Sequence, residues 1–309
     1  MWLLASAGPW AERKLECECL NARTPRPTSP GARVASGAEG AAWSLPDLRE
    51  PRYSQSLERG LAVLRCFTPE RPVLGIAEIA DELGMSRSTT HRYVITLAAL
   101  SYLEQDASRK YRLGLRVTDL GMSALNATGL REHAQPYLEE LRQRTSYTSS
   151  LAVLDGPEIV YVARVRSFRR GQHTSDLGFA PGSRLPAYCT AMGKLLLAYL
   201  PESEQRELVA ELRLTQQGPN TITSKQELRD ELGAIRAEGI AVNDEELAAE
   251  LHSIAAPVRD DGREVVAAIS LVAHTSVISL AELVDALSPH LIATADRVSA
   301  RLGYRRDDA

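Results

Sequence analysis

The order of the elements between residues 54 and 116 constrains the fold more than any other feature of this 309-residue sequence. Apolar residues at helical spacing predict a first helix, capped by Ser56 and stopped by Pro69, and then a short second helix. Gly84 punctuates the end of the second helix, and Ser86 is placed to cap a third one. Two helices joined by a short turn that contains glycine predict a helix-turn-helix.

A basic hairpin is predicted directly after the third helix. Residues 102–105 and 110–113 have the composition of two short strands that are separated by a four-residue turn. Strand alternation puts Lys110 and Arg112 on one face of this hairpin. Three helices followed by such a hairpin predict a winged helix-turn-helix domain over residues 54–116, in which the hairpin is the wing beside the DNA backbone.

The charge of the chain is uneven in a way that favours a nucleic-acid surface. The formal net charge is −4 at pH 7, yet residues 84–116 hold six basic side chains and two acidic ones. Short polar side chains at the start of the third helix permit close approach to a major groove, where arginine reaches guanine or phosphate. The predicted DNA-contacting residues are Ser86, Arg87, Ser88, Thr89, Thr90, Arg92, Arg109, Lys110 and Arg112. Taken alone, the third helix also fits a solvated amphipathic helix of any small bundle.

The segments on either side of this domain differ in composition. Residues 1–53 contain prolines and glycines without a sustained period, which predicts a disordered tail; a start codon placed too far upstream is the alternative explanation. Residues 117–129 are expected to form a linker helix. Its apolar stripe consists of Val117, Leu120, Ala124 and Leu125. This stripe packs either on a partner chain, as a dimer seam, or on the chain's own second domain.

Residues 130–304 show a different pattern, in which strands and helices interleave. Turn signals at residues 155–157 and 260–262 join neighbouring strands into hairpins. Hairpin-joined strands with helices before, between and after them predict an α+β domain on a mostly antiparallel sheet. The whole chain is therefore expected to have an α+β fold, with two folded domains joined by the linker helix.

Cysteine usage and hydrophobicity indicate the compartment. The four cysteines are spaced too irregularly for a disulfide framework or a paired zinc motif. No run of about 18 apolar residues occurs, so the sequence predicts no membrane span. A reducing cytoplasm is the simplest compartment. Cys17 and Cys19 could bind a soft metal, but without a second cluster they are interpreted as incidental thiols, and no metal site is predicted.

No motif in the second domain predicts an enzyme. The pair Gly193-Lys194 resembles the end of a phosphate-binding loop, but Leu195 stands where that loop needs serine or threonine. Cys189 with His252 or His274 is a candidate nucleophilic pair, because such partners need to meet only in the folded chain. A ligand pocket requires less, namely an apolar floor with a few polar groups. The sequence therefore predicts no catalytic residue and no cofactor.

Four segments in the expected order resemble the IclR family of bacterial transcriptional regulators. They are residues 56–64 (SLERGLAVL), 84–92 (GMSRSTTHR), 190–198 (TAMGKLLLA) and 254–260 (IAAPVRD). The resemblance implies a GAF-like effector domain over residues 130–304, assembly into dimers or tetramers, and control by a small organic acid. Within the family, residues 159–164 and 184–190 are similar to the regulators of protocatechuate and β-ketoadipate catabolism.

The resemblance also implies a set of effector-binding residues. Carried over from the glyoxylate-responsive member, they are Ala191, Met192, Asn243, Ser253, Ser270 and Val272. Asn243 replaces a carboxylate, Val272 replaces a hydroxyl, and Met192 is larger than expected, so a bigger and partly apolar acid is expected instead of glyoxylate or pyruvate. Its carboxylate is expected at the hydroxyls of Ser253 and Ser270 or at the backbone amides that start the helix near residue 190. Ordinary core packing is the alternative role of each residue.

The sequence thus predicts a cytoplasmic, sequence-specific regulator that is controlled by a small organic acid of aromatic catabolism. One recognition helix reads only a few base pairs, so a homo-oligomer on a palindromic double-stranded operator is expected. The alternative hypothesis is a metabolite-binding protein or enzyme that uses its C-terminal domain and keeps the N-terminal module for protein contacts. DNA-binding assays separate the two hypotheses.

Overall fold

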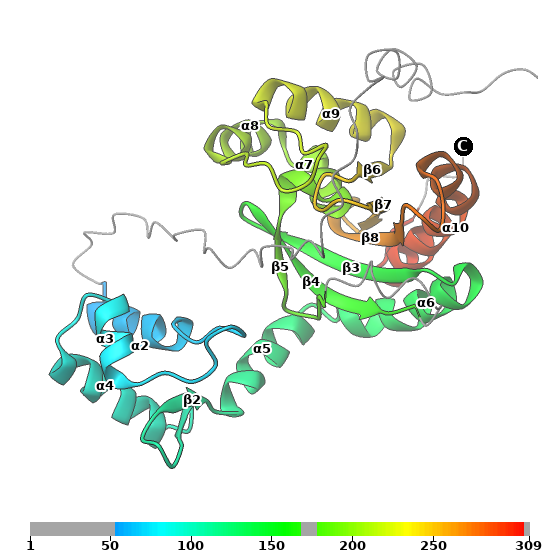
Figure 1. Ribbon diagram of the computed structural model, residues 1–309. Helices are drawn as coiled ribbons and strands as arrows, with labels where there is room; N and C mark the ends of the chain where they lie inside the picture. Colours follow the sequence, from blue (N-terminus) through cyan, green and yellow to red (C-terminus); the bar gives the residue numbers. More distant parts are fainter. Residues whose placement is uncertain (1–52, 168–177, 306–309) are drawn as a thin grey trace, which may run out of the picture. The chain divides into compact units, whose positions relative to one another are not determined.

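The computed structural model describes residues 53–167 and 178–305 (Figure 1). The N-terminal part of these residues is a small domain of helices and one hairpin. Its elements are α2 (Gln55–Arg65), α3 (Ile76–Glu82), α4 (Arg87–Ala99), β1 (Leu103–Gln105) and β2 (Tyr111–Leu113). β1 and β2 pair antiparallel, so the predicted order of three helices and a hairpin is confirmed. The predicted tail, with Cys17 and Cys19, lies outside the described residues apart from its last residue.

Capping chemistry sets the helix ends of this domain. Ser86 caps α4 as predicted, because its hydroxyl accepts a hydrogen bond at 3.2 Å from the backbone N–H three residues later. Gly84 takes the left-handed conformation (φ 61°) that favours glycine after a helix. The prediction for α2 is wrong by two residues. Ser54 has the extended backbone of an N-cap and accepts from Leu57 N, whereas Ser56 already lies inside the helix.

A small apolar core holds the three helices and the wing together. Its buried residues are Val63, Cys66, Phe67, Leu74, Ile79, Val94, Leu103 and Tyr111. Tyr111 belongs to the wing, and its backbone exchanges two hydrogen bonds with Leu74, at 2.8 and 2.9 Å. The wing is therefore fixed to the segment between α2 and α3 and does not depend on its own short ladder alone.

Two helices follow the wing, α5 (Arg116–Asn126) and α6 (Leu130–Thr145). α5 is the predicted linker helix, and none of its residues is buried. Leu120, on the predicted apolar stripe, is 57% exposed. Leu125, at the end of the stripe, packs against the core of the chain's own second domain, whereas Leu120 remains exposed for contact with another chain.

The second domain is built on a six-stranded sheet in the order β5-β4-β3-β8-β7-β6, in which every neighbouring pair is antiparallel. Its strands are β3 (Thr148–Asp155), β4 (Glu158–Val165), β5 (Arg184–Pro186), β6 (Ala241–Asp244), β7 (Leu251–Arg259) and β8 (Val265–His274). The predicted α+β class with a mostly antiparallel sheet is confirmed. β5 was not predicted, because three residues are too few to show strand alternation.

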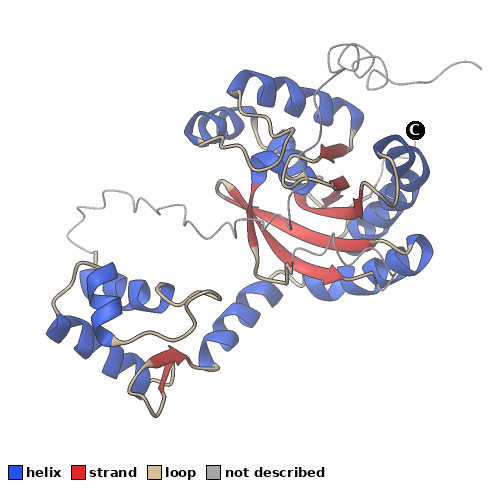
Figure 2. Cartoon of the chain, in the orientation of Figure 1, coloured by secondary structure: helices blue, strands red, loops and turns tan. Residues whose placement is uncertain are grey.

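Helices cover both faces of this sheet (Figure 2). α6 and α10 (Leu280–Arg301) cover one face. The other face is covered by α7 (Ala191–Tyr199), α8 (Glu202–Glu211) and α9 (Lys225–Glu238). Alternate residues of β8 divide between the two cores: Ile269 packs with α6 and α10, and Ala268 packs with α7. No helix within the two described segments, α10 included, is both long and apolar enough to span a bilayer.

Candidate DNA-binding surface and ligand cavity

The start of α4 presents most of the polar residues predicted to contact DNA. Those with at least partial exposure are Ser86, Arg87, Ser88, Thr89 and Arg92. Thr90 is the exception, because it is fully buried and its hydroxyl donates a hydrogen bond to Ser86 O at 3.1 Å. The prediction that Thr90 contacts DNA is therefore wrong. Helical spacing turns it inward with Val94, four residues later.

Asp106 organises the turn of the wing. Its carboxylate accepts hydrogen bonds from Ser108 N at 2.8 Å, from the Ser108 hydroxyl at 2.6 Å and from Lys110 N at 3.0 Å. The hydrogen bond from the Ser108 side chain is the main cause that holds the pKa of Asp106 below its usual value. Arg109 occupies the same turn with φ 64° and is exposed. The turn therefore presents its basic residues from an ordered backbone.

The cations of this surface differ in their partners. Lys110 Nζ lies 3.2 Å from Glu78 Oε2, and Arg112 Nη2 lies 2.9 Å from Glu104 Oε2. All four side chains are well exposed, and ion pairs in such positions contribute little to stability. Either cation can therefore exchange its carboxylate for a phosphate at small cost. The other predicted cations have no ion-pair partner among the described residues; they are Arg87, Arg92 and Arg109.

The second domain contains a narrow cavity at the start of α7, with a volume of about 30 Å³. All six residues predicted to bind an effector line it: Ala191, Met192, Asn243, Ser253, Ser270 and Val272. The other lining residues are Tyr161, Arg164, Phe179, Thr190, Leu247 and Leu251. The fold therefore brings together residues from α7, four strands and two loops that are far apart in the sequence.

Three of the lining residues form one row across neighbouring strands. Asn243 on β6 pairs with Ser253 on β7, which pairs with Val272 on β8. Asn243 is also engaged with the backbone, because its Nδ2 donates to Cys189 O at 2.6 Å and its Oδ1 accepts from Glu246 N at 3.3 Å. Asn243 therefore holds the cavity wall in position as well as lining it.

Arg164 lines the same cavity and was missed from the sequence. Simple alternation along β4 puts Arg164 and Tyr161, three residues apart, on opposite faces. A β-bulge at Val162 inserts one extra residue against the Leu151–Ala152 step of β3, so both side chains face the cavity. The guanidinium carbon of Arg164 lies 5.6 Å from the ring centroid of Tyr161. The available signal in the sequence was an arginine inside an otherwise apolar strand.

The start of α7 forms the cavity wall that faces the sheet. Thr190 is the N-cap, and its hydroxyl accepts a hydrogen bond from Gly193 N at 3.0 Å. Gly193 has no space for a side chain, since a Cβ there would lie 2.2 Å from Ala187 O. The helix can therefore begin close to the preceding turn, with its partly positive N-terminal end at the cavity.

Lys194 is completely buried next to this wall. Its Nζ lies 2.5 Å from Glu246 Oε1 and 3.0 Å from Glu231 Oε1. Burial disfavours the charged amine, but the two carboxylates outweigh burial and raise the pKa of Lys194 above its ordinary value. Burial also raises the pKa of Glu246. The Gly193-Lys194 pair is thus a structural link from α7 to α9 and to the loop after β6.

The candidate nucleophilic pair is not assembled. The partner of Cys189 Sγ among the described residues is Pro186 O, at 3.8 Å. Burial raises the pKa of this thiol to about 12, so it is not a thiolate at neutral pH. His252 and His274 each lie within 4.0 Å of a carboxylate instead. The site therefore offers no activated cysteine.

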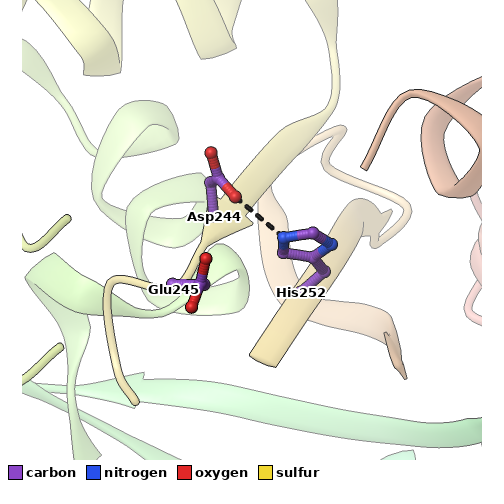
Figure 3. A group of neighbouring side chains, drawn as sticks. All are labelled: Asp244, Glu245 and His252. Carbon is purple, nitrogen blue, oxygen red and sulfur yellow. Dashed lines mark ion pairs between the residues drawn. The ribbon is translucent and has the colours of Figure 1, made fainter. Parts of the chain in front are cut away.

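Asp244, Glu245 and His252 lie close together at the end of β6 (Figure 3). One ligand atom from each lies within 4.8 Å of the others. The register explains the grouping, because Asp244 pairs directly with His252 and its Oδ1 lies 2.8 Å from His252 Nε2. Both residues alternate with Asn243 and Ser253, so their side chains point away from the cavity. The cross-strand contact accounts for Asp244 and His252, and Glu245 is the next residue along the chain.

An exposed recognition helix and wing, followed by an α+β domain with an enclosed cavity, define a DNA-binding transcriptional regulator. Two family comparisons agree. The IclR helix-turn-helix domain matches residues 56–107, and the C-terminal domain of bacterial IclR transcriptional regulators matches residues 122–300. The chain belongs to the IclR family. It is therefore a regulator and not an enzyme.

Relatives of known name and structure support this membership. The Pca regulon regulatory protein of Pseudomonas putida is 33% identical over 80% of this chain and 83% of its own length. A transcriptional regulator from Rhodococcus sp. RHA1 is 40% identical, with a TM-score of 0.71 over 81% of this chain and 98% of that chain. An IclR homologue from Microbacterium hydrocarbonoxydans, complexed with 4-hydroxybenzoate, is 28% identical, with a TM-score of 0.70 over 80% of this chain and 98% of that chain.

Proposed function

We propose that this regulator binds a small organic acid of aromatic catabolism in the cavity at the start of α7 and changes its affinity for DNA in response. The observation that carries the proposal is the cavity itself, because the six residues that the family resemblance implied surround it. Polar hydroxyls and an amide share the lining with methionine, leucines and aromatic rings, as in a site for a partly apolar acid. The relatives named for the Pca regulon and for 4-hydroxybenzoate support an aromatic pathway.

The DNA half of the proposal assigns α4 to the major groove. Arg87 and Arg92 contact base edges or phosphates from α4, and the basic side chains of the wing contact the adjacent backbone. A palindromic operator then needs at least a dimer, for which the apolar stripe of α5 is the proposed seam. Action on double-stranded DNA places the protein in the bacterial cytoplasm.

The decisive experiment measures operator affinity with and without candidate acids. The full chain first selects its operator from random duplexes, and affinity is then measured in the presence of benzoate, 4-hydroxybenzoate, 3,4-dihydroxybenzoate, pyruvate and hexanoate. We expect at least one acid to change the affinity and to raise the melting temperature of the protein, since a ligand at 100 times its Kd stabilises by about 2.7 kcal/mol. Sequence-independent DNA binding, or no response to any acid, would contradict the proposal.

Variants of the cavity test its location. Ala191→Leu adds bulk at a site that is 1% exposed, so we expect a protein that still binds its operator but no longer responds to the acid. Ser270→Ala removes one hydroxyl and should weaken the response while operator binding stays unchanged. Wild-type responses from both variants would show that the acid binds elsewhere.

A further inference from the structure

We propose that Arg164, which the hydroxyl of Ser150 holds in place, binds the carboxylate of an aromatic acid together with the hydroxyl of Ser270. This inference rests on the proposed function, because it assigns the two ends of the ligand to the two ends of the same cavity. The sequence-based expectation placed the carboxylate at Ser253 and Ser270 or at the amides of α7, whereas the present inference keeps Ser270 and adds Arg164. The difference determines which acids the cavity accepts.

The position of Arg164 follows from the register of the sheet. Ser150 on β3 pairs with Arg164 on β4 at one side and with Ser270 on β8 at the other. Arg164 Nη1 donates to Ser150 Oγ at 3.2 Å, so the guanidinium reaches across β3 in the direction of β8. The three side chains therefore form one polar row across the sheet. The two ends of this row, Arg164 and Ser270, line the cavity, and each carries a hydrogen-bond donor for a carboxylate.

The charge of the cavity selects an anion. Among the described residues that line it, Arg164 is the one with a charge, and none is acidic. Ser270 lines this end of the cavity and is 5% exposed, so this end is shielded from water. An anion that leaves water needs charge-assisted hydrogen bonds in exchange, and a planar guanidinium supplies them to a carboxylate. A neutral analogue of the same shape forms no hydrogen bond between opposite charges with the guanidinium.

The aromatic neighbours of Arg164 favour a flat ligand. The rings of Tyr161 and Phe179 are stacked, with centroids 5.8 Å apart at an interplanar angle of 30°. The guanidinium carbon lies 5.6 Å from the first ring centroid and 6.0 Å from the second. Aromatic rings prefer such offset stacking, so a ring attached directly to the bound carboxylate can extend the stack of Tyr161 and Phe179. The rest of the lining is mainly apolar: Met192, Leu247, Leu251 and Val272.

The present volume of the cavity adds a requirement. About 30 Å³ admits one or two water molecules and is far below the several hundred Å³ typical of ligand sites. A benzoate-sized ring therefore enters only if lining side chains change rotamer. Met192 lines the cavity from the first turn of α7. Its side chain is unbranched and flexible, which suits it to this movement. Binding is thus coupled to repacking at the start of α7.

The test compares acids with a neutral analogue by calorimetry on the full chain. The ligands are benzoate, 4-hydroxybenzoate, 4-hydroxybenzamide, pyruvate and hexanoate, and the variants are Arg164→Gln and Arg164→Lys. Arg166→Gln is the matched control, because it removes the same charge from an exposed position two residues along the chain. Melting temperature and operator affinity without ligand show that each variant is folded.

We expect wild type and Arg166→Gln to bind an aromatic acid equally and the benzamide weakly. Arg164→Gln should lose about 10- to 100-fold in affinity for the acid, and Arg164→Lys should recover part of it. Equal acid binding by Arg164→Gln and wild type overturns the inference, as does binding of aliphatic acids alone, while the proposed function survives both results. If Arg164→Gln does not fold, the Lys variant and the benzamide comparison decide, and equal affinity for acid and amide refutes the inference. Failure of every acid to bind wild type refutes both proposals.

Discussion

The DNA-facing surface and the effector domain each contain a lysine–glutamate ion pair, and the two pairs differ in exposure and in role. In the DNA-binding domain, Lys110 of the wing and Glu78 of α3 keep 47% and 46% of their side-chain surface in water. Inside the effector domain, Lys194 and Glu246 keep 1% and 8%. The exposed pair can exchange its partner for a phosphate, whereas the buried pair cannot separate without leaving charges in the protein interior. Exposure thus distinguishes a charge that serves binding from a charge that serves the fold.

The largest effect on stability is expected when the buried ion pair is broken. Lys194→Met leaves Glu231 and Glu246 without their cation, and removal of one partner from a buried ion pair costs about 3 to 5 kcal/mol. Urea unfolding of the full chain measures this loss. Lys110→Met is the matched control, because it removes the same charge from an exposed pair, and its unfolding curve should overlay that of wild type.

A compensating variant sharpens this result. Lys194→Met combined with Glu231→Gln and Glu246→Gln removes all three charges and should regain a substantial part of the lost stability.

The same buried pair also predicts how stability depends on pH in alkali. Because the folded state raises the pKa of Lys194 above 10.5, its contribution is complete below pH 10.5 and is lost as pH rises through the folded pKa. Equal effects of Lys194→Met and Lys110→Met would show that burial does not distinguish the two pairs.

The next largest effect concerns base recognition. Arg92→Ala removes an exposed cation from α4 and should cost about 1 to 3 kcal/mol in operator binding while relaxing the preference at one base pair. Competition binding against a panel of single-base operator variants measures both quantities. An unchanged base preference would mean that Arg92 contacts phosphate alone.

A smaller effect is expected on the wing. Arg112→Ala should weaken binding to all sequences alike and reduce the slope of log affinity against log salt by about one, because one phosphate contact is lost. Its pairing with Glu104 makes the effect smaller than that of Arg92→Ala, since part of the Arg112 charge is already compensated. A specificity profile that matches the Arg92→Ala profile would contradict the assignment of separate roles.

The smallest effect is a loosening of the wing turn in acid. The folded state lowers the pKa of Asp106, so its hydrogen bonds contribute above the ordinary aspartate pKa and are lost as pH falls through the folded value. Amide exchange at Ser108 and Lys110, measured by NMR, should accelerate at that point. Asp106→Asn should show the fast exchange at every pH.

The elements that sequence reasoning predicted correctly are those with strong local signals. Helical spacing and the Ser86 cap located α3 and α4, and the turns at residues 155–157 and 260–262 located two hairpins of the sheet. Local rules failed where two residues satisfied them equally. Ser54 and Ser56 are both good caps, and only the backbone conformation distinguishes them.

The site residues that were missed depend on features without a local signal. Thr90 is a residue type that often contacts DNA, but its side chain faces the core. Arg164 faces the cavity only because a bulge shifts the alternation of side chains along β4. The strand order that aligns Arg164, Ser150 and Ser270 cannot be read from the periodicity of any one segment. The six predicted cavity residues were found through family resemblance, because no spacing in the sequence links them.

The adjacency of β3 and β8 has a consequence for biosynthesis. These central strands join residues 148–152 to residues 268–272, near the start and the end of the effector domain. Contacts between such distant segments slow folding, and this ladder cannot form until nearly the whole chain has left the ribosome. The winged domain, whose contacts are local, can fold while the effector strands are still being made. A polypeptide that terminates before residue 268 therefore retains the DNA-reading module but lacks the β8 partner of β3, and the backbone N–H and C=O groups along that edge of β3 stay unpaired.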